Sequence, residues 1–360
     1  MQSFTPNRNK TSIGLPFFLA LLLVAILIIT VVIMLIVDMS SNNDTKAHEN
    51  NTDLEEITNE TEPSSKDVFA SNIPVSPTKE SRTSYIIGRA PDVITISDEI
   101  KSNNTILVEL DSYTSIVEKS ADAKIYPSSM TKVMTLVVAC ENITDLYESL
   151  TVTQEMADYM KDNDGSGVGL KVGQSYLVED LLYLISYQSD TIACLLIAEK
   201  VAGGEDEFVA LMNKKAADLG LSGTHFTNCT GLYNENHYTT CRDMAAIMAY
   251  AMDNELAYLI LSSYTGRPMV VGDDNCTFYA NWYSGKERLA DNPNLKTSKV
   301  IAGKTGYTDE SGFTFVTVAK GDNGKTYINV IVGLPKGSGL RESMLTSEVK
   351  NIYNTYIKED

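Results

Sequence analysis

Residues 126–135 read Tyr-Pro-Ser-Ser-Met-Thr-Lys-Val-Met-Thr and place Ser129 three residues before Lys132, at the start of a strongly apolar stretch. We expect a helix to begin at Ser129, so that the two side chains stand one turn apart on the same face. The Ser129 hydroxyl then lies at the positive end of the helix dipole, which favours a developing alkoxide. A lysine can accept the serine proton only if its pKa falls toward neutrality, which burial or a nearby cation can cause. The stretch therefore predicts a nucleophilic serine whose base is a lysine.

The Ser-x-x-Lys spacing by itself is weak evidence, because the chain repeats it twice elsewhere. It recurs at Ser76 and Lys79, in a polar segment, and at Ser347 and Lys350, near the end of the chain. We interpret both repeats as chance matches. The weight of the first motif depends on the apolar helix that it opens and on the motifs that follow it.

A second lysine motif, Lys304-Thr305-Gly306, lies near the C-terminal end of the chain. The preceding Gly303 makes it similar to the end of a phosphate-binding loop, but Ser298 stands where that loop needs another glycine. In an acyl-transfer site Gly306 would let the backbone approach the substrate closely. Lys304 and Thr305 would hold a carboxylate, and Lys304 could also be the nearby cation that the first motif requires.

The second motif in chain order, Ser189-Asp190-Thr191, lies between the two lysine motifs, so that Lys304-Thr305-Gly306 is the third. Alone it reads as an ordinary helix start with Ser189 as the N-cap, and it gains weight from its position in the series. A Gly-x-Ser-x-Gly elbow is absent from the sequence. The three histidines give little support to a Ser-His-Asp triad, and one of them, His48, lies in the polar N-terminal segment.

In their order along the chain, the three motifs resemble those of the serine-type D-Ala-D-Ala carboxypeptidases, the low-molecular-mass penicillin-binding proteins of peptidase family S11. The likeness covers about residues 84–357. Besides residues 126–135, it is carried by residues 167–173 with 178–182, 228–232 with 237–244, and 303–308 with 311–313. The resemblance implies an α+β fold of the β-lactamase/transpeptidase type, with no metal or other cofactor. It implies two kinds of ligand: peptidoglycan stem peptides that end in D-Ala-D-Ala, and β-lactam antibiotics.

The resemblance also implies the catalytic roles. Ser129 would attack the carbonyl of the penultimate D-Ala and form an acyl-enzyme, Lys132 would be the base, and Ser189 would relay a proton to the leaving D-Ala. The backbone N–H groups of Ser129 and Tyr307 would form the oxyanion hole. Water would then release the shortened peptide.

The substrate-binding residues implied by the resemblance are Thr191, Lys304, Thr305, Gly306 and Tyr307. Thr191 departs from the family, which usually has asparagine at that position. Threonine can still form a hydrogen bond, but it is shorter and has no amide N–H to offer the substrate. Two alternatives to a carboxypeptidase therefore stay open.

The first alternative is a β-lactamase, and the second is a catalytically weak penicillin-binding sensor or cell-wall-binding protein. A class A β-lactamase needs a glutamate for deacylation, and no Glu-x-x-Leu-Asn lies between the second and third motifs. The sensor is suggested by Thr191. Turnover separates the three: a sensor stays acylated, a β-lactamase clears penicillin quickly, and a carboxypeptidase releases D-Ala.

Composition excludes several classes of partner and site. The net charge of −18 argues against nucleic acid, since phosphate binding needs a basic face. The sequence contains neither Cys-x-x-Cys nor His-Glu-x-x-His, so it signals no zinc or redox motif. A disulfide between Cys229 and Cys241 could form outside the cytosol, but the low density of cysteine favours free thiols.

The N-terminal part predicts a membrane anchor. Residues 15–37 are almost entirely apolar and uncharged, long enough for a helix to cross a bilayer core of about 30 Å. Arg8 and Lys10 precede the run, and Asp38 and Asp44 follow it. The positive-inside rule then places residues 1–14 in the cytoplasm and everything after Val37 outside. The run is longer than the apolar region of a signal peptide and has no Ala-x-Ala site after it, so we expect an uncleaved single-pass anchor that replaces the C-terminal anchor of many relatives.

Two further segments complete the predicted organisation. Residues 38–83 are rich in Ser, Asn, Thr and Glu and are expected to form a disordered stalk, and residues 84–360 the penicillin-binding domain. In that domain we expect hairpins over 105–119 and 314–332, a strand at 299–304 that approaches a turn, helices over 178–184, 191–201, 207–219 and 244–252, and a closing helix over 340–357. This order predicts an antiparallel sheet built from both ends of the domain, with a central helical block.

Overall fold

The computed structural model describes residues 84–97, 100–263, 268–271, 276–279, 295–335 and 341–358. All of them lie within the second of the two units of the chain, residues 65–360. The predicted anchor (15–37) and stalk (38–83) lie outside the described residues. Among the described residues no single helix has the length and apolar character needed to cross a membrane. Only α8 (Cys241–Asp253) and α9 (Glu255–Ser262), a pair of helices bent by 107° relative to each other, meet both conditions jointly.

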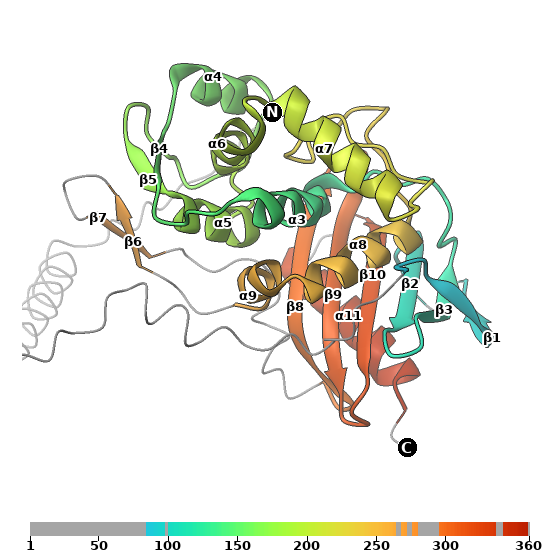
Figure 1. Cartoon of the computed structure of the whole chain (residues 1–360). Coiled ribbons are helices and arrows are strands. Elements are labelled where there is room, and N and C mark those ends of the chain that lie inside the picture. Colours follow the sequence, from blue (N-terminus) through green and yellow to red (C-terminus); the bar gives the residue numbers. More distant parts are fainter. Residues whose placement is uncertain are drawn as a thin grey trace, which may run out of the picture. The chain divides into compact units, whose positions relative to one another are not determined.

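The domain is organised around a six-stranded sheet in the order β1-β3-β2-β10-β9-β8 (Figure 1). The strands come from the two ends of the described chain, as predicted. The N-terminal end supplies β1 (Gly88–Thr95), β2 (Asn104–Glu109) and β3 (Thr114–Lys119), and the C-terminal end supplies β8 (Ser298–Thr308), β9 (Gly312–Gly321) and β10 (Thr326–Leu334).

Two details of the sheet differ from the prediction. The sheet is mixed and not purely antiparallel, because the edge strand β1 pairs with β3 in parallel. Strand β1 was not expected, and most of its residues are exposed, so it lacks the alternation that marks a half-buried strand. The strand expected to end near residue 304 is also longer: β8 continues to Thr308 through the whole Lys304-Thr305-Gly306 motif, paired with β9 along its length.

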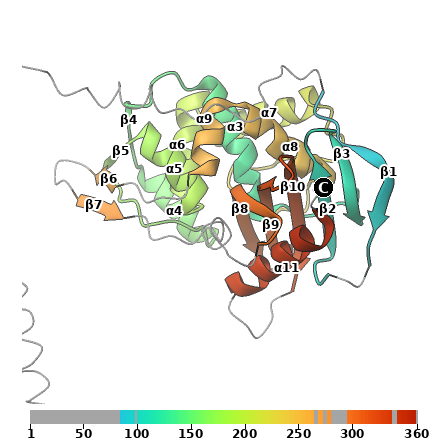
Figure 2. The same cartoon turned by 90° about the horizontal axis from the view of Figure 1, so that it is seen from below.

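Each face of the sheet has its own apolar core, and β10 contributes to both by alternation. Ile328 and Val330 face the helical block, whereas Tyr327 and Ile331 face the closing helix α11 (Arg341–Tyr356). Figure 2 shows α8 and α11 on opposite sides of the sheet. The sheet is therefore held between the helical block and one covering helix.

The helical block between the two groups of strands confirms the predicted helices, and no helix end differs from its predicted position by more than three residues. It also contains elements that were not predicted, namely the short helices α4 and α9 and the two-stranded sheets β4–β5 and β6–β7. The bounds are η1 Ser128–Thr131, α3 Lys132–Asn142, β4 Ser149–Thr151, α4 Gln154–Asp162, β5 Ser175–Leu177, α5 Val178–Tyr187, α6 Thr191–Ala202, α7 Glu205–Asp218, α8 Cys241–Asp253, α9 Glu255–Ser262, β6 Pro268–Val271 and β7 Cys276–Tyr279.

One prediction within this block is corrected, and the free thiols expected at Cys229 and Cys241 are confirmed. The α-helix of the first motif begins at Lys132 and not at Ser129, because Ser129 lies in the 3₁₀ turn η1 that precedes it. Cys229 and Cys241 are both free and buried. The thiol of Cys229 donates to Glu205 Oε1 at 3.2 Å, so it is engaged by a carboxylate and not by a second sulfur in a disulfide.

Candidate active site

Lys132 is held against Ser129 at the junction of η1 and α3. Its ammonium nitrogen Nζ lies 3.4 Å from Ser129 Oγ and donates to the carbonyl oxygen of Thr230 at 2.5 Å. Lys132 is 1% exposed, whereas Ser129 is half-buried. A buried ammonium needs hydrogen-bond acceptors, and these two oxygens supply them. The first motif therefore has the geometry that a serine and its lysine base require.

The loop at residues 228–232 supplies the carbonyl group that fixes Lys132. The amide of Asn228 folds this loop: its Oδ1 accepts from the N–H groups of Thr230 and Gly231 at 3.2 and 2.7 Å, and its Nδ2 donates to the carbonyl of Leu232 at 2.9 Å. Gly231 has a φ of +80°. The sequence pattern placed this segment in the family likeness but gave no sign of its role, because Lys132 is bound by a backbone atom.

A buried histidine supports the turn that carries Ser129. His237 Nε2 lies 2.8 Å from Thr131 Oγ1, and its Nδ1 accepts from the N–H of Thr227 at 3.1 Å. The ring proton must then reside on Nε2, where it is donated to Thr131. Burial lowers the pKa of His237 from 6.5 to about 3, with the charges of His225 and Lys132 adding to the effect. A neutral His237 thus orients η1 and is not part of a Ser-His-Asp triad.

The second and third motifs meet each other through Lys304. Its Nζ donates to Ser189 Oγ at 3.1 Å and to the carbonyl of Thr305 at 2.9 Å. Lys304 is 2% exposed, while Ser189 and Thr305 are half-buried. The two lysines thus lie inside the site, and the hydroxyl groups of Ser129, Ser189 and Thr305 are the more accessible groups.

Asp190, which lies between two predicted site residues, has a structural role. Its Oδ1 accepts from the N–H of Ala193 at 2.9 Å, so the N-cap of α6 is Asp190 and not Ser189. Ser189 is free of that task because its backbone has a φ of +56°, which turns the chain just before the helix. Burial raises the pKa of Asp190, although the N–H groups of Ala193 and Val168 and the charge of Lys132 oppose this.

Strand β8 approaches the nucleophile directly at Gly306. A methyl group added there would lie 2.2 Å from Ser128 Oγ and 2.8 Å from the backbone nitrogen of Ser129. No side chain larger than hydrogen fits, which is the physical reason for glycine in the third motif. The next residue, Tyr307, is half-buried and packs its ring 4.6 Å from that of Phe313. Because Tyr307 follows Gly306 directly, its backbone lies next to the point where β8 contacts η1.

Thr191 is not open to solvent. It is 1% exposed, and its N–H donates to the carbonyl of Ser166 at 2.8 Å. A methyl group added at Gly165 would lie 2.8 Å from Thr191 Oγ1. The loop 164–168 therefore covers Thr191, although the sequence assigned this residue to direct substrate binding.

The same loop 164–168 borders Ser189, and this contact was missed from the sequence. Ser166 Oγ donates to the carbonyl of Ser189 at 2.7 Å, and the N–H of Val168 donates to Asp190 Oδ2 at 2.8 Å. A methyl group at Gly167 would lie 2.6 Å from the same carboxylate oxygen. The glycines at 165 and 167 were the available signal, since a run of small residues permits such a close approach. Elsewhere in the described ranges, no three His, Cys, Asp or Glu side chains gather into a group that could hold a metal ion.

Comparison with known proteins gives a consistent result. A family model described as D-alanyl-D-alanine carboxypeptidase matches residues 91–335. The D-alanyl-D-alanine carboxypeptidase DacF of Bacillus subtilis (strain 168) is 32% identical over 224 residues, which are 62% of this chain and 55% of that protein. The chain thus spans about half the length of the curated relatives that it matches first.

Solved structures agree with the fold. The crystal structure of the Streptomyces K15 DD-transpeptidase is similar with a TM-score of 0.63 and 25% identity, covering 73% of this chain and 98% of that one. The crystal structure of a D-alanyl-D-alanine carboxypeptidase from Mycobacterium tuberculosis H37Rv gives a TM-score of 0.61 and 25% identity, over 74% of this chain and 96% of that one. These findings confirm the predicted β-lactamase/transpeptidase-like fold.

The fit between Gly231 and the nucleophile turn predicts a large effect of one methyl group. A methyl group at Gly231 would lie 2.0 Å from the carbonyl oxygen of Ser128, whereas at Gly324, which has a φ of +83°, it would meet nothing within 4 Å. We expect Gly324→Ala to lower the free energy of unfolding by about 1–2 kcal/mol, the cost of a left-handed residue with a side chain. Gly231→Ala should cost at least about 3 kcal/mol, because it adds overpacking to that strain. Urea unfolding measures both variants, and equal losses would contradict this packing.

Proposed function

Because the chain belongs to the D-alanyl-D-alanine carboxypeptidase family, we propose that it is a serine D-Ala-D-Ala carboxypeptidase that shortens peptidoglycan stem peptides through an acyl-enzyme on Ser129. The observation that carries the proposal is the pair of contacts within one site. Lys132 Nζ lies 3.4 Å from Ser129 Oγ, and Lys304 Nζ lies 3.1 Å from Ser189 Oγ. The first contact joins a nucleophile to its base, and the second joins a cation to a second hydroxyl group. The proposed reaction needs all four of these groups.

In the proposed first step, Ser129 Oγ forms a bond to the carbonyl carbon of the penultimate D-Ala, and its proton passes to Lys132. Lys132 must be neutral to accept this proton. The carbonyl of Thr230, which accepts a hydrogen bond from Lys132 Nζ, keeps the lysine in place whether it is charged or neutral.

In the same step the bond between that carbonyl carbon and the nitrogen of the terminal D-Ala breaks. Ser189 relays a proton to the leaving amine, while Lys304 and Thr305 hold the carboxylate of the departing residue. The backbone N–H groups of Ser129 and Tyr307 stabilise the tetrahedral oxyanion. The close approach of Gly306 to Ser129 supports this assignment, since it brings β8 alongside the nucleophile turn.

Water then attacks the ester carbon of the acyl-enzyme, the bond to Ser129 Oγ breaks, and the serine regains its proton. A β-lactam would react by the same first step, because its ring amide presents a carbonyl and a nearby carboxylate to the same groups. Because Thr191 is buried, we propose that it acts on substrate binding indirectly. It would position the loop 164–168, which borders the substrate site beside Ser189.

Release of D-Ala from a peptide ending in D-Ala-D-Ala tests this function. The wild-type chain should release D-Ala continuously, and Lys132→Ala should lower the rate by about 10²–10⁴-fold, the usual contribution of a general base. Lys304→Arg should cost much less, because arginine keeps the cation that faces the carboxylate. Equal losses in both variants would show that the two roles are assigned wrongly. A wild type that is acylated by penicillin yet releases no D-Ala would favour the sensor.

We further propose that residues 15–37 anchor the protein in the cell membrane, with the catalytic domain outside the cytoplasm. The support is the uncharged apolar run and the basic residues before it. Protease added to intact protoplasts should remove the domain and leave a short N-terminal fragment in the membrane. Recovery of a secreted form that begins after residue 37 would contradict an uncleaved anchor.

A further inference from the structure

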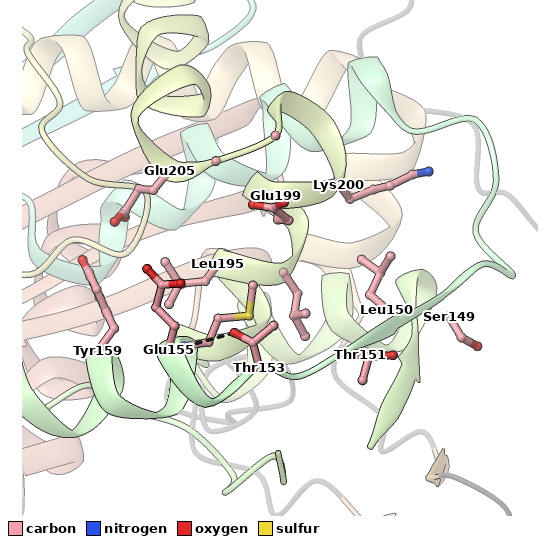
Figure 3. A pocket seen from close by; sticks show the side chains of 14 residues that line it. Ser149, Leu150, Thr151, Thr153, Glu155, Tyr159, Leu195, Glu199, Lys200 and Glu205 are labelled. Atoms are coloured by element: carbon pink, nitrogen blue, oxygen red, sulfur yellow. Dashed lines mark hydrogen bonds between the residues drawn. The ribbon is translucent and has the colours of Figure 1, made fainter. Parts of the chain in front are cut away.

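A cavity of about 610 Å³ lies apart from the candidate active site, between β4, α4, α6 and the turn into α7 (Figure 3). Its apolar lining comes from Leu150, Met156, Leu195 and Leu196. The volume falls within the range of about 300–1,000 Å³ that is typical of small-molecule sites. None of the motif residues lines it, so the proposed reaction does not account for this cavity.

The polar part of the cavity is acidic. Glu155 from α4, Glu199 from α6 and Glu205 from the start of α7 all line it. Figure 3 shows Glu155 and Glu205 beside Tyr159 on one side of the cavity, with Lys200 extending away from them. Three carboxylates that border an apolar surface create a negative potential next to a place where an alkyl chain can be buried.

The basic residue among the lining side chains does not neutralise these carboxylates. Lys200 Nζ forms its ion pair with Glu148 at 2.5 Å, and Glu148 does not line the cavity. Glu155 and Glu199 are both exposed, and among the described residues neither forms an ion pair or a side-chain hydrogen bond. Both carboxylates are therefore available to a ligand.

Glu205 is fixed in place before any ligand arrives. Its Oε1 accepts from the backbone N–H of Cys229 at 3.0 Å and from the thiol of the same residue at 3.2 Å. A carboxylate held in this way loses little conformational freedom when it binds a cation. It also ties the cavity wall to the loop 228–232, so Glu205 is unsuitable for substitution in a test of binding alone.

From these features we propose that the cavity binds a primary ammonium group carried on an apolar stem, as in the lysine-type side chain of a peptide. The ammonium group would donate hydrogen bonds to Glu155 and Glu199 near the fixed Glu205. The methylene stem would lie on Met156 and Leu195, as lysine stems do on apolar surfaces elsewhere. A free polyamine carries the same chemistry, but the size of the cavity leaves room for peptide backbone beside the stem and favours the peptide source.

Calorimetric titration of the full chain tests the proposal with matched probes. Nα-acetyl-L-lysine N-methylamide should bind at least about tenfold more tightly than its norleucine analogue, which keeps the stem and lacks the ammonium group. The 2,3-diaminopropionate analogue, which keeps the ammonium on a shorter stem, should also bind more weakly. Comparable affinity for the lysine and norleucine probes would overturn the site. Tighter binding of 1,5-diaminopentane than of the lysine probe would keep the cation site but assign it to a polyamine.

Substitutions locate the binding within the chain. Glu155→Gln and Glu199→Gln should each lower the affinity for the lysine probe by about tenfold, because each removes one charged acceptor. Asp158→Asn removes the same charge from the same helix α4 at a position outside the cavity lining, and it should leave the affinity unchanged. Ser129→Ala should bind the probe as the wild type does, which separates this site from the proposed active site. Unchanged affinity in both glutamate variants, or loss of binding in Ser129→Ala, would overturn the proposal.

Discussion

The buried ammonium of Lys132 is the constraint on which the site depends. A lysine that is 1% exposed must find acceptors inside the protein, and it finds the carbonyl of Thr230 at 2.5 Å and the hydroxyl of Ser129 at 3.4 Å. The first contact requires the loop 228–232 to be folded by the amide of Asn228, and the tight turn at Gly231 lets this loop pack against η1. The hydrogen bonds that the buried Lys132 requires thus fix the position of Ser129.

The second lysine extends this arrangement across the domain. Lys304 lies on β8, at the edge of the sheet, and Ser189 lies between two helices of the block, so their contact at 3.1 Å joins the two layers. The absence of a side chain at Gly306 brings the same strand against the nucleophile turn. In the proposed reaction, the contacts that hold the sheet against the helical block therefore also place the reacting groups.

Much of this architecture could be predicted because its signals are local. Apolar spacing identified α5, α6, α7, α8 and α11, and the turn between β9 and β10 followed from the glycines that bracket it. The missed parts depend on contacts distant in sequence or on backbone atoms. Strand β1 is largely exposed and carries no alternation, the capping role of Asp190 depends on the left-handed backbone of Ser189, and the carbonyl of Thr230 has no side-chain signature. The burial of Thr191 beneath the loop 164–168 likewise follows from tertiary packing.

The most direct test of the central claim is to locate the acyl group by mass spectrometry. The full chain is labelled with a penicillin, digested, and fragmented finely enough to separate Ser129 from its neighbour Ser128, whose hydroxyl donates to the carbonyl of Pro127 at 2.7 Å. The account predicts a single adduct on Ser129 in the wild type and none in Ser129→Ala. An adduct on Ser128 or Ser189, or labelling that persists in Ser129→Ala, would contradict it.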